Sequence, residues 1–359
     1  MIHFQLVFNE LQFQGLGAEK LNNFMTILDT FKSRIQAADR ILITTHEFPD
    51  ADGIGSEIAL CLALRALGKK AFCLNEEPLL ERYQYLDQDK VVQGYKDFML
   101  QHADFKADLM IVVDTNTITR IGKNLAQFIG ESLPTLYIDH HPCRGRDLAT
   151  HCIDVTAAAT GQMVGEMIES LGVKFTKKMA LPIYTAIIID TSSFRYPTVS
   201  ASTHRLVAKL MDTGIHPPEA YNGIYGTKRI VHMHLLSKIL NSAATNTNET
   251  IAWMLLKKED IDQFKTDIED THAFINHLLI LNNIKVAIMF RDDGDQIKMS
   301  LRSSGDIDVG LIAQALGGGG HSHSAATILF RLPGEGTQEV IKKSITNVEE
   351  IVKKLESDA

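Results

Sequence analysis

Residues 42–56 read Leu-Ile-Thr-Thr-His-Glu-Phe-Pro-Asp-Ala-Asp-Gly-Ile-Gly-Ser, and this stretch decides the expected fold. An apolar run typical of a buried strand ends in His46, Asp50 and Asp52, and residues 53–67 then carry apolar side chains at helical spacing. A strand, loop and helix of this kind is typical of an α/β domain, whose ligands gather at the carboxyl ends of the strands. The loop is therefore expected to hold cations, although an Asp-x-Asp pair alone is as often a solvated turn.

Three more apolar segments end in acidic or imidazole side chains. Residues 109–113 are followed by Asp114, residues 135–138 by Asp139-His140-His141, and residues 187–189 by Asp190. One such ending is expected by chance, but four in one core predict a single site.

The chemistry of these side chains indicates metal ions. Carboxylates and imidazoles without a thiolate suit Mn²⁺ or Mg²⁺, and the imidazoles favour Mn²⁺. The set has too many anionic groups for one small ion, so it predicts two ions, which together activate water and bind a phosphoryl group. We therefore expect a phosphate ester or anhydride as substrate. The predicted ligands are His46, Asp50, Asp52, Asp114, His140 and Asp190.

Composition limits the function classes. The 359 residues suffice for two domains, and the net charge of −8 argues against binding of long duplex nucleic acid. No apolar run approaches the length of a membrane span, and the N-terminus lacks signal-peptide order. The four cysteines form no Cys-x-x-Cys pair, which predicts buried thiols in a reducing cytoplasm.

The expected architecture has two α/β parts. Apolar strands alternate with helices over residues 22–200, which predicts a doubly wound, mainly parallel sheet. A helical linker over 201–249 ends in a polar run, and a smaller α/β domain with a mixed sheet is expected over 250–345. The apolar segment 179–189 fits a helix or a strand by its period alone.

A second cluster lies in the smaller domain. Residues Gly317-Gly318-Gly319-Gly320 precede His321 and follow an apolar helix pattern over 309–316. Consecutive glycines let a backbone approach a ligand and turn its amides toward an anion, and Arg302 offers a planar fork for phosphate or a base edge. A flexible linker is the alternative interpretation of the glycine run.

These residues resemble a known family. His46-x-x-Pro49-Asp50-x-Asp52, Asp114, Asp139-His140-His141 and Asp190 resemble, in order and spacing, the motifs of the DHH phosphoesterase family. The motifs around Arg302-Ser303, Gly318-Gly319-Gly320-His321 and Ala325-Ala326 resemble its DHH-associated C-terminal domain, and the whole set is most similar to the nanoRNase branch. Two positions depart from the family pattern, because Thr327 and Ser192 stand where glycine is common.

The resemblance implies a role for each residue. His46 and Asp50 would hold one Mn²⁺, Asp52 and His140 the other, with Asp114 bridging and Asp190 completing the shell. His141 would contact the scissile phosphate or assist proton transfer, and Asp139 would orient the histidines. The substrate would be held in a cleft between the domains by Arg302, Ser303, Gly318, Gly319, Gly320 and His321, together with Arg195.

The sequence thus predicts a Mn²⁺-dependent phosphodiesterase, with Mg²⁺ or Co²⁺ as alternative ions. Its expected substrates are short single-stranded oligoribonucleotides, cleaved to nucleoside 5′-monophosphates, and also pAp; no membrane partner is expected. Four alternatives stay open, namely a pApA or cyclic-dinucleotide phosphodiesterase, an inorganic pyrophosphatase and a non-catalytic nucleotide-binding regulator. A homodimer also stays open, because the sequence does not fix the oligomeric state.

Overall fold

The chain forms two compact units, Met1–Gly226 and Thr227–Ala359. This computed structural model describes residues 30–130, 132–143, 149–226, 229–266, 268–271, 273–303, 305–320 and 322–357. The predicted start of the first domain at residue 22 lies outside these ranges, and the described chain begins with a helix over 30–37. The units divide within the predicted linker 201–249, and the predicted domain boundaries stay predictions.

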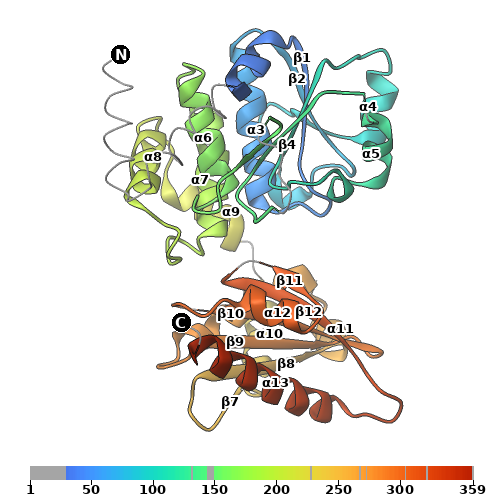
Figure 1. The fold of residues 1–359 in the computed structure, drawn as a ribbon, viewed down its shortest axis with the longest axis vertical. Helices are drawn as coiled ribbons and strands as arrows, with labels where there is room; N and C mark the ends of the chain where they lie inside the picture. The colour runs from blue at the N-terminus through green and yellow to red at the C-terminus, as the bar shows by residue number, and fades with distance from the viewer. Residues whose placement is uncertain are drawn as a thin grey trace. The chain divides into compact units, whose positions relative to one another are not determined.

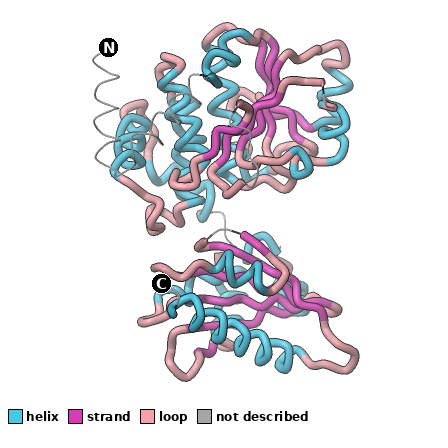
Figure 2. Tube along the Cα trace, in the orientation of Figure 1, coloured by secondary structure: helices cyan, strands magenta, loops and turns pink. Residues whose placement is uncertain are grey.

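The first unit contains the predicted doubly wound sheet. Six strands, all parallel, lie in the order β3-β2-β1-β4-β5-β6, which confirms the predicted fold class. Figures 1 and 2 show the strands of this sheet together with the helices of the unit. The elements of this unit are β1 (Arg40–Thr44), α3 (Ala51–Ala66), β2 (Lys70–Asn75), η1 (Glu81–Tyr83), β3 (Val92–Gly94), α4 (Tyr95–Gln101), β4 (Leu109–Val113), η2 (Ile118–Arg120), α5 (Lys123–Ile129), β5 (Thr135–Asp139), β6 (His151–Ile153), α6 (Thr160–Ser170), α7 (Lys177–Asp190), α8 (Ala201–Met211) and α9 (Pro217–Tyr225).

Helices cover both faces of this sheet, α4 and α5 on one side and α3 on the other (Figure 1). Successive strand residues point to opposite faces, so Met110 packs with α4 and α5 while Ile111 packs in the core that contains α3. Because both faces are buried, the strands are apolar throughout and do not alternate with polar residues.

The ambiguous segment 179–189 is helical and forms most of α7. Its residues from Met179 to Ile188 are buried, so no polar face marks the helical period in the sequence. The helix packs closely against α3, because a Cβ added at Gly55 would lie 2.4 Å from the carbonyl oxygen of Pro182. This close packing determines where the last residue of α7, Asp190, lies.

The second unit is built on a mixed sheet with the order β11-β12-β10-β9-β8-β7. Its strands are drawn in magenta in Figure 2. Only β8 and β9 pair in parallel among its described pairs. One face packs with α12 and α13, and the other with α10, α11 and η4. The elements are α10 (Ile230–Leu240), β7 (Ala244–Thr245), β8 (Ile251–Lys257), α11 (Lys258–Phe264), η3 (Ile268–Thr271), η4 (Phe274–Ile280), β9 (Val286–Asp292), β10 (Gln296–Ser303), α12 (Val309–Ala315), β11 (Gly319–Gly320), β12 (Ser324–Phe330) and α13 (Thr337–Ser357). Across the described ranges, no helix has both the length and the apolar character needed to span a membrane.

Candidate active site

The predicted ligands meet where the strand order of the first sheet reverses. The strands β1 and β4 are neighbours. From this pair, the sheet extends through β2 on the β1 side and through β5 on the β4 side. His46 follows β1, Asp114 follows β4 and His140 follows β5, so three parallel strands deliver these residues to one edge. Ligands of doubly wound sheets bind at such a switch point.

The loop after β1 ends at the N-terminus of α3, and the two aspartates of this loop have different surroundings. Asp50 is the N-cap and accepts hydrogen bonds from the amides of Asp52, at 2.8 Å, and Gly53, at 3.3 Å. A Cβ added at Gly53 would lie 2.2 Å from the Oγ1 atom of Thr45, so glycine is required for α3 to begin this close to β1. Asp52, in the first turn, is fully buried.

The first residues of α6 stabilise the Asp52 carboxylate by hydrogen bonds. The sequence did not predict that these residues belong to the site. The amides of Thr160 and Gly161 each donate to its carboxylate at 2.8 Å. The first amides of a helix have no partners within the helix and lie at the positive end of its dipole, so they stabilise a buried anion. The run of small residues 157–161 before an apolar helix pattern is the signal that could have revealed this support.

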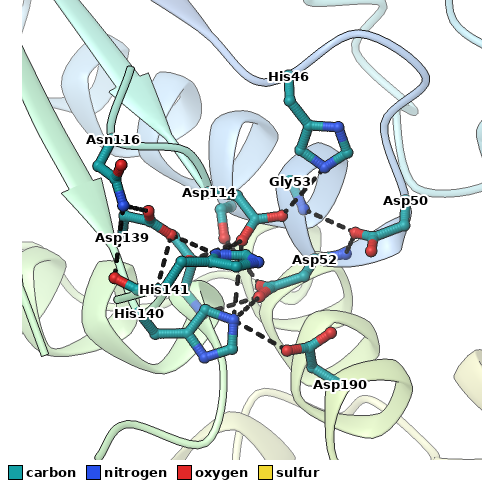
Figure 3. Close-up of polar contacts among 12 residues, drawn as sticks. His46, Asp50, Asp52, Gly53, Asp114, Asn116, Asp139, His140, His141 and Asp190 are labelled. Atoms are coloured by element: carbon teal, nitrogen blue, oxygen red, sulfur yellow. Dashed lines mark hydrogen bonds and ion pairs between the residues drawn. The ribbon is translucent and has the colours of Figure 1, made fainter. Parts of the chain in front are cut away.

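Asp114 lies at the centre of the cluster and is 2% exposed. Its carboxylate oxygens lie 3.5 Å from Nε2 of His46, 3.7 Å from Nδ1 of His141 and 3.9 Å from Nε2 of His140 (Figure 3). Thr160 donates its hydroxyl to Oδ1 at 3.0 Å. Asp114 has a φ of +61°, a left-handed conformation that aspartate and asparagine adopt more readily than most other side chains.

Asp190 brings a carboxylate to the cluster from the end of α7. Its Oδ2 atom lies 2.9 Å from Nε2 of His140, and that nitrogen is 3.7 Å from Oδ2 of Asp52 (Figure 3). These three residues come from three different elements, and they meet because α7 packs against α3.

A second chain of contacts fixes His141. Its Nδ1 atom lies 2.7 Å from Oδ1 of Asp139, which also accepts the backbone amide of His141 at 3.1 Å. The other oxygen of Asp139 accepts a hydrogen bond from Nδ2 of Asn116 at 2.7 Å. Asn116, also missed in the sequence, therefore orients the carboxylate that orients the imidazole.

The charges of the cluster are unbalanced. Burial, with the charges of Asp114 and Asp190 nearby, raises the pKa of Asp52 well above its usual range. Burial and the charge of Asp50 likewise raise the pKa of Asp114. Burial lowers the pKa of His140, but its hydrogen bond to Asp190 and the neighbouring carboxylates outweigh this and raise that pKa well above normal.

This imbalance fits divalent cations, which would neutralise the excess carboxylate charge. Three groups of three residues overlap, and within each group the ligand atoms lie within 4.8 Å of one another. No thiolate is among them. The donors are the oxygens and imidazole nitrogens that Mn²⁺ and Mg²⁺ accept. The groups are His46 with Asp50 and Asp114, Asp52 with His140 and Asp190, and Asp114 with His140 and His141.

Arg195 lies in a tight turn just after Asp190. Ser192, Ser193 and Phe194 have φ values of +50°, +65° and +64°, three left-handed residues in succession. The Arg195 side chain donates to Ser192, to its carbonyl at 2.8 Å and to its hydroxyl at 3.0 Å. The hydroxyl of Thr191 accepts the Phe194 amide at 2.9 Å. In this structure Arg195 stabilises the turn, and its contact with substrate stays a prediction.

In the second unit, two adjacent predicted substrate residues differ in exposure. Arg302 is half-buried at the end of β10, whereas Ser303 is 1% exposed. The Ser303 hydroxyl lies 3.0 Å from Nδ1 of His323, so it bonds within the unit and a direct substrate contact stays a prediction. The hydroxyl of Thr327, which departs from the family pattern, donates to the Leu316 carbonyl at 2.9 Å and so fixes strand packing.

The glycine run forms the edge strand β11 rather than a flexible linker. Gly319 pairs with Ala326 and Gly320 with Ala325. A Cβ added at Gly318 would lie 2.2 Å from the Ala326 carbonyl oxygen, and Gly320 has a φ of +147°. Glycine is therefore required at these two positions by close backbone packing. His321, the predicted partner of this run, lies outside the described residues.

Comparisons with known proteins agree with the motif resemblance. Residues 40–187 match the DHH family N-terminal domain, and residues 252–354 match the DHHA1 domain. The bifunctional oligoribonuclease and PAP phosphatase NrnA of Thermus thermophilus is 27% identical over 305 residues, which cover 85% of this chain and 89% of that protein. The Bacillus subtilis protein of the same name is 26% identical over 302 residues, 82% of this chain and 91% of that protein.

A solved structure shares the fold. An exopolyphosphatase-related protein from Bacteroides fragilis superposes with a TM-score of 0.80 at 23% identity, and the match covers 91% of this chain and 96% of that one. At 23% identity, this similarity shows a shared fold and nothing about function.

Proposed function

Since the chain is a phosphoesterase of the DHH family that also carries a DHHA1 domain, we propose that it hydrolyses short single-stranded oligoribonucleotides to nucleoside 5′-monophosphates. We further propose that it removes the 3′-phosphate of pAp. One observation carries the proposal: separate segments of the first unit bring seven carboxylate and imidazole side chains into three overlapping groups, and within each group the ligand atoms lie within 4.8 Å of one another. The two NrnA proteins, similar along most of the chain, support the substrate class.

The cluster would hold two divalent ions that share Asp114. Together, two such ions polarise a phosphoryl group and supply a nucleophile from water. We propose Mn²⁺ because imidazoles accompany the carboxylates, with Mg²⁺ or Co²⁺ as alternatives. The proposed ligands are His46 and Asp50 for one ion and Asp52, His140 and Asp190 for the other, with Asp114 available to both.

His141 is the group we propose for proton transfer or for contact with the phosphate. Its contact with Asp139 at 2.7 Å supports Nδ1 as the donor, which leaves Nε2 as the basic atom that we propose for the substrate. The hydrogen bond from Asn116 keeps Asp139 in place. Because Asp139 accepts hydrogen bonds from His141 despite its burial, its pKa is lowered, and it stays an anion that stabilises a protonated imidazole.

The second unit would recognise the nucleotide. Arg302 can form two parallel hydrogen bonds with a phosphate or a base edge, and the exposed Gly319 leaves room for a ligand beside β11. All four cysteines are free thiols, and on this basis we propose a reducing, cytoplasmic location.

The test is a substrate panel with added Mn²⁺, Mg²⁺ or Co²⁺ and with a chelator. Oligoribonucleotides of two to five residues, pAp, pApA, a cyclic dinucleotide, pyrophosphate and a nitrophenyl phosphodiester are incubated with purified protein, and the products are separated by chromatography. We expect release of nucleoside 5′-monophosphates with Mn²⁺ and none with the chelator. Intact oligoribonucleotides in every metal would refute the proposal.

The same panel separates the other functions. Phosphate release from pyrophosphate alone would identify a pyrophosphatase, and cleavage of the dinucleotides alone would identify a dinucleotide phosphodiesterase. Nucleotide binding without turnover of any substrate would identify a regulator. Arg302→Ala should raise KM for oligoribonucleotides more than for the nitrophenyl ester, which has no nucleobase; equal losses would contradict the proposed role of Arg302.

A further inference from the structure

Phe48 is the most exposed large apolar side chain that the structure describes, with 90% of its surface accessible. It lies two residues from His46 and two from Asp50, the two ends of the loop that Figure 3 shows reaching the cluster. Two extended residues span at most about 7 Å, so the Cα atom of Phe48 lies no farther than about 7 Å from the Cα atoms of both predicted ligands. None of the proposed metal or substrate roles uses this side chain.

Two unfavourable features coincide at this residue. Its φ is +54°, a left-handed conformation in which a bulky side chain is a genuine outlier that costs about 1–3 kcal/mol. Its ring gains nothing from burial in the core, because it is left in water. A folded protein gains no stability from placing phenylalanine there, which indicates that the exposed ring serves binding.

The loop holds the backbone that carries this ring in a defined conformation. The Glu47 amide donates to the Arg120 carbonyl at 2.6 Å, which attaches the loop to the turn after β4. Nδ1 of His46 lies 2.8 Å from the Glu47 carbonyl oxygen, and Asp50 caps α3. Pro49, the next residue, has a fixed φ. Because the backbone that carries the ring is already held, little backbone entropy is lost when the ring binds a ligand.

We propose that Phe48 is a stacking platform for the nucleobase of the nucleotide whose phosphate enters the metal cluster. The inference rests on the proposed function and names how that site recognises its substrate. An aromatic ring stacks on every base, so it gives affinity for nucleotides without preference for sequence. This is the recognition that an enzyme acting on mixed short oligoribonucleotides needs, and sugar phosphates without a base would not benefit from it.

The test measures binding of AMP and of ribose 5-phosphate, which has no base, by calorimetry with Mn²⁺ present. Base stacking contributes about 1–3 kcal/mol, so AMP should bind the wild-type protein roughly 5- to 100-fold more tightly than ribose 5-phosphate. In Phe48→Ala this ratio should fall by about 5-fold or more, while Phe48→Trp should keep it. Leu100→Ala removes another exposed apolar side chain, 84% accessible on α4, and should leave the ratio unchanged.

The outcomes separate this inference from the proposed function. An unchanged ratio in Phe48→Ala, equal weakening of both ligands, or no AMP binding to the wild type would overturn the stacking role. If the wild type cleaves oligoribonucleotides and Phe48→Ala does so with the same KM, only the stacking role is lost. If the ratio depends on Phe48 but no oligoribonucleotide is cleaved, the proposed function is lost and the base site stands. Circular dichroism of each variant verifies that it is folded.

Discussion

Replacing Asp114 by asparagine is expected to stabilise the metal-free protein and to abolish hydrolysis. Asparagine has nearly the same shape as aspartate, and it is one of the few residues that tolerate a φ of +61°. The Thr160 hydroxyl donates a hydrogen bond to Asp114 at 3.0 Å, and the side-chain oxygen of asparagine can accept the same bond. The change therefore removes one negative charge with little other disturbance, whereas alanine would add backbone strain.

The magnitude follows from the surroundings of the carboxylate. Burial and the charge of Asp50 raise the pKa of Asp114 above its ordinary value of 3.8, so the unfolded chain releases this proton at a lower pH than the folded protein. Between those two pKa values the folding free energy becomes less favourable as pH rises. Asparagine has no such proton, so the variant should gain about 1–2 kcal/mol at pH 8 and almost nothing near pH 4.

The assay is thermal unfolding of the chelator-treated protein, and calorimetry or far-ultraviolet circular dichroism monitors the unfolding. Fluorescence is unsuitable, because the single tryptophan, Trp253, lies in β8 of the second unit. For a unit of about 200 residues, the gain corresponds to roughly 2–8 °C in Tm. Mn²⁺ at a hundred times its Kd should stabilise the wild type by about 2.7 kcal/mol and the variant by less.

The control is Asp104→Asn, which removes an exposed carboxylate in the same unit and should change stability by less than about 0.5 kcal/mol. A metal-free Asp114→Asn protein that is less stable than the wild type, or equally more stable at pH 4 and pH 8, would refute the electrostatic reasoning. Hydrolysis at the wild-type rate would refute the role of Asp114 as a shared ligand.

Three further predictions follow from buried contacts. Gly55→Ala should cost about 1–3 kcal/mol of unfolding free energy and lower activity, since its Cβ would push against the Pro182 carbonyl and displace α7, as denaturant titration would show. Burial raises the pKa of Glu166 to about 7, so the contribution of this carboxyl group to folding stability falls as pH rises from about 4.5 to 7. Glu166→Gln should therefore be up to about 3 kcal/mol more stable than the wild type at pH 8 and equally stable at pH 4. Thr191→Val leaves the Phe194 amide without its acceptor, so it should cost about 1–3 kcal/mol and reduce kcat by loosening the turn after Asp190.

Each of these predictions has a contradicting result, and the first two also have a matched control. Gly336→Ala, where an added Cβ meets nothing within 4 Å, should be nearly neutral; a Gly55→Ala protein of unchanged stability would contradict the close packing of α3 and α7. Glu77→Gln, at an exposed position, should show no pH-dependent gain, and the same absence in Glu166→Gln would contradict the raised pKa. A Thr191→Val protein with wild-type stability would show that its hydroxyl is dispensable.

Much of the fold could be predicted because it is encoded in local pattern. The apolar runs of β1, β4 and β5 identify strands buried on both faces, and a parallel sheet then requires their carboxyl ends to share an edge. Asp114 and His140 directly follow β4 and β5, and His46 lies two residues after β1, so their meeting could be predicted from the sequence. The glycine run was harder to assign, because only pairing with β12 distinguishes an edge strand from a linker.

What the sequence determined by itself is the long apolar strands, the polar endings of β1, β4 and β5, and the residue types of a metal cluster, because each is a property of a few consecutive residues. The tertiary structure alone decided that α7 is a helix, that it carries Asp190 to within 2.9 Å of His140, and that the first amides of α6 support Asp52. These contacts join residues 50 to 109 positions apart, and they depend on how closely helices pack. No periodicity in the chain encodes that distance, since it is set by the side chains that fill the space between the helices.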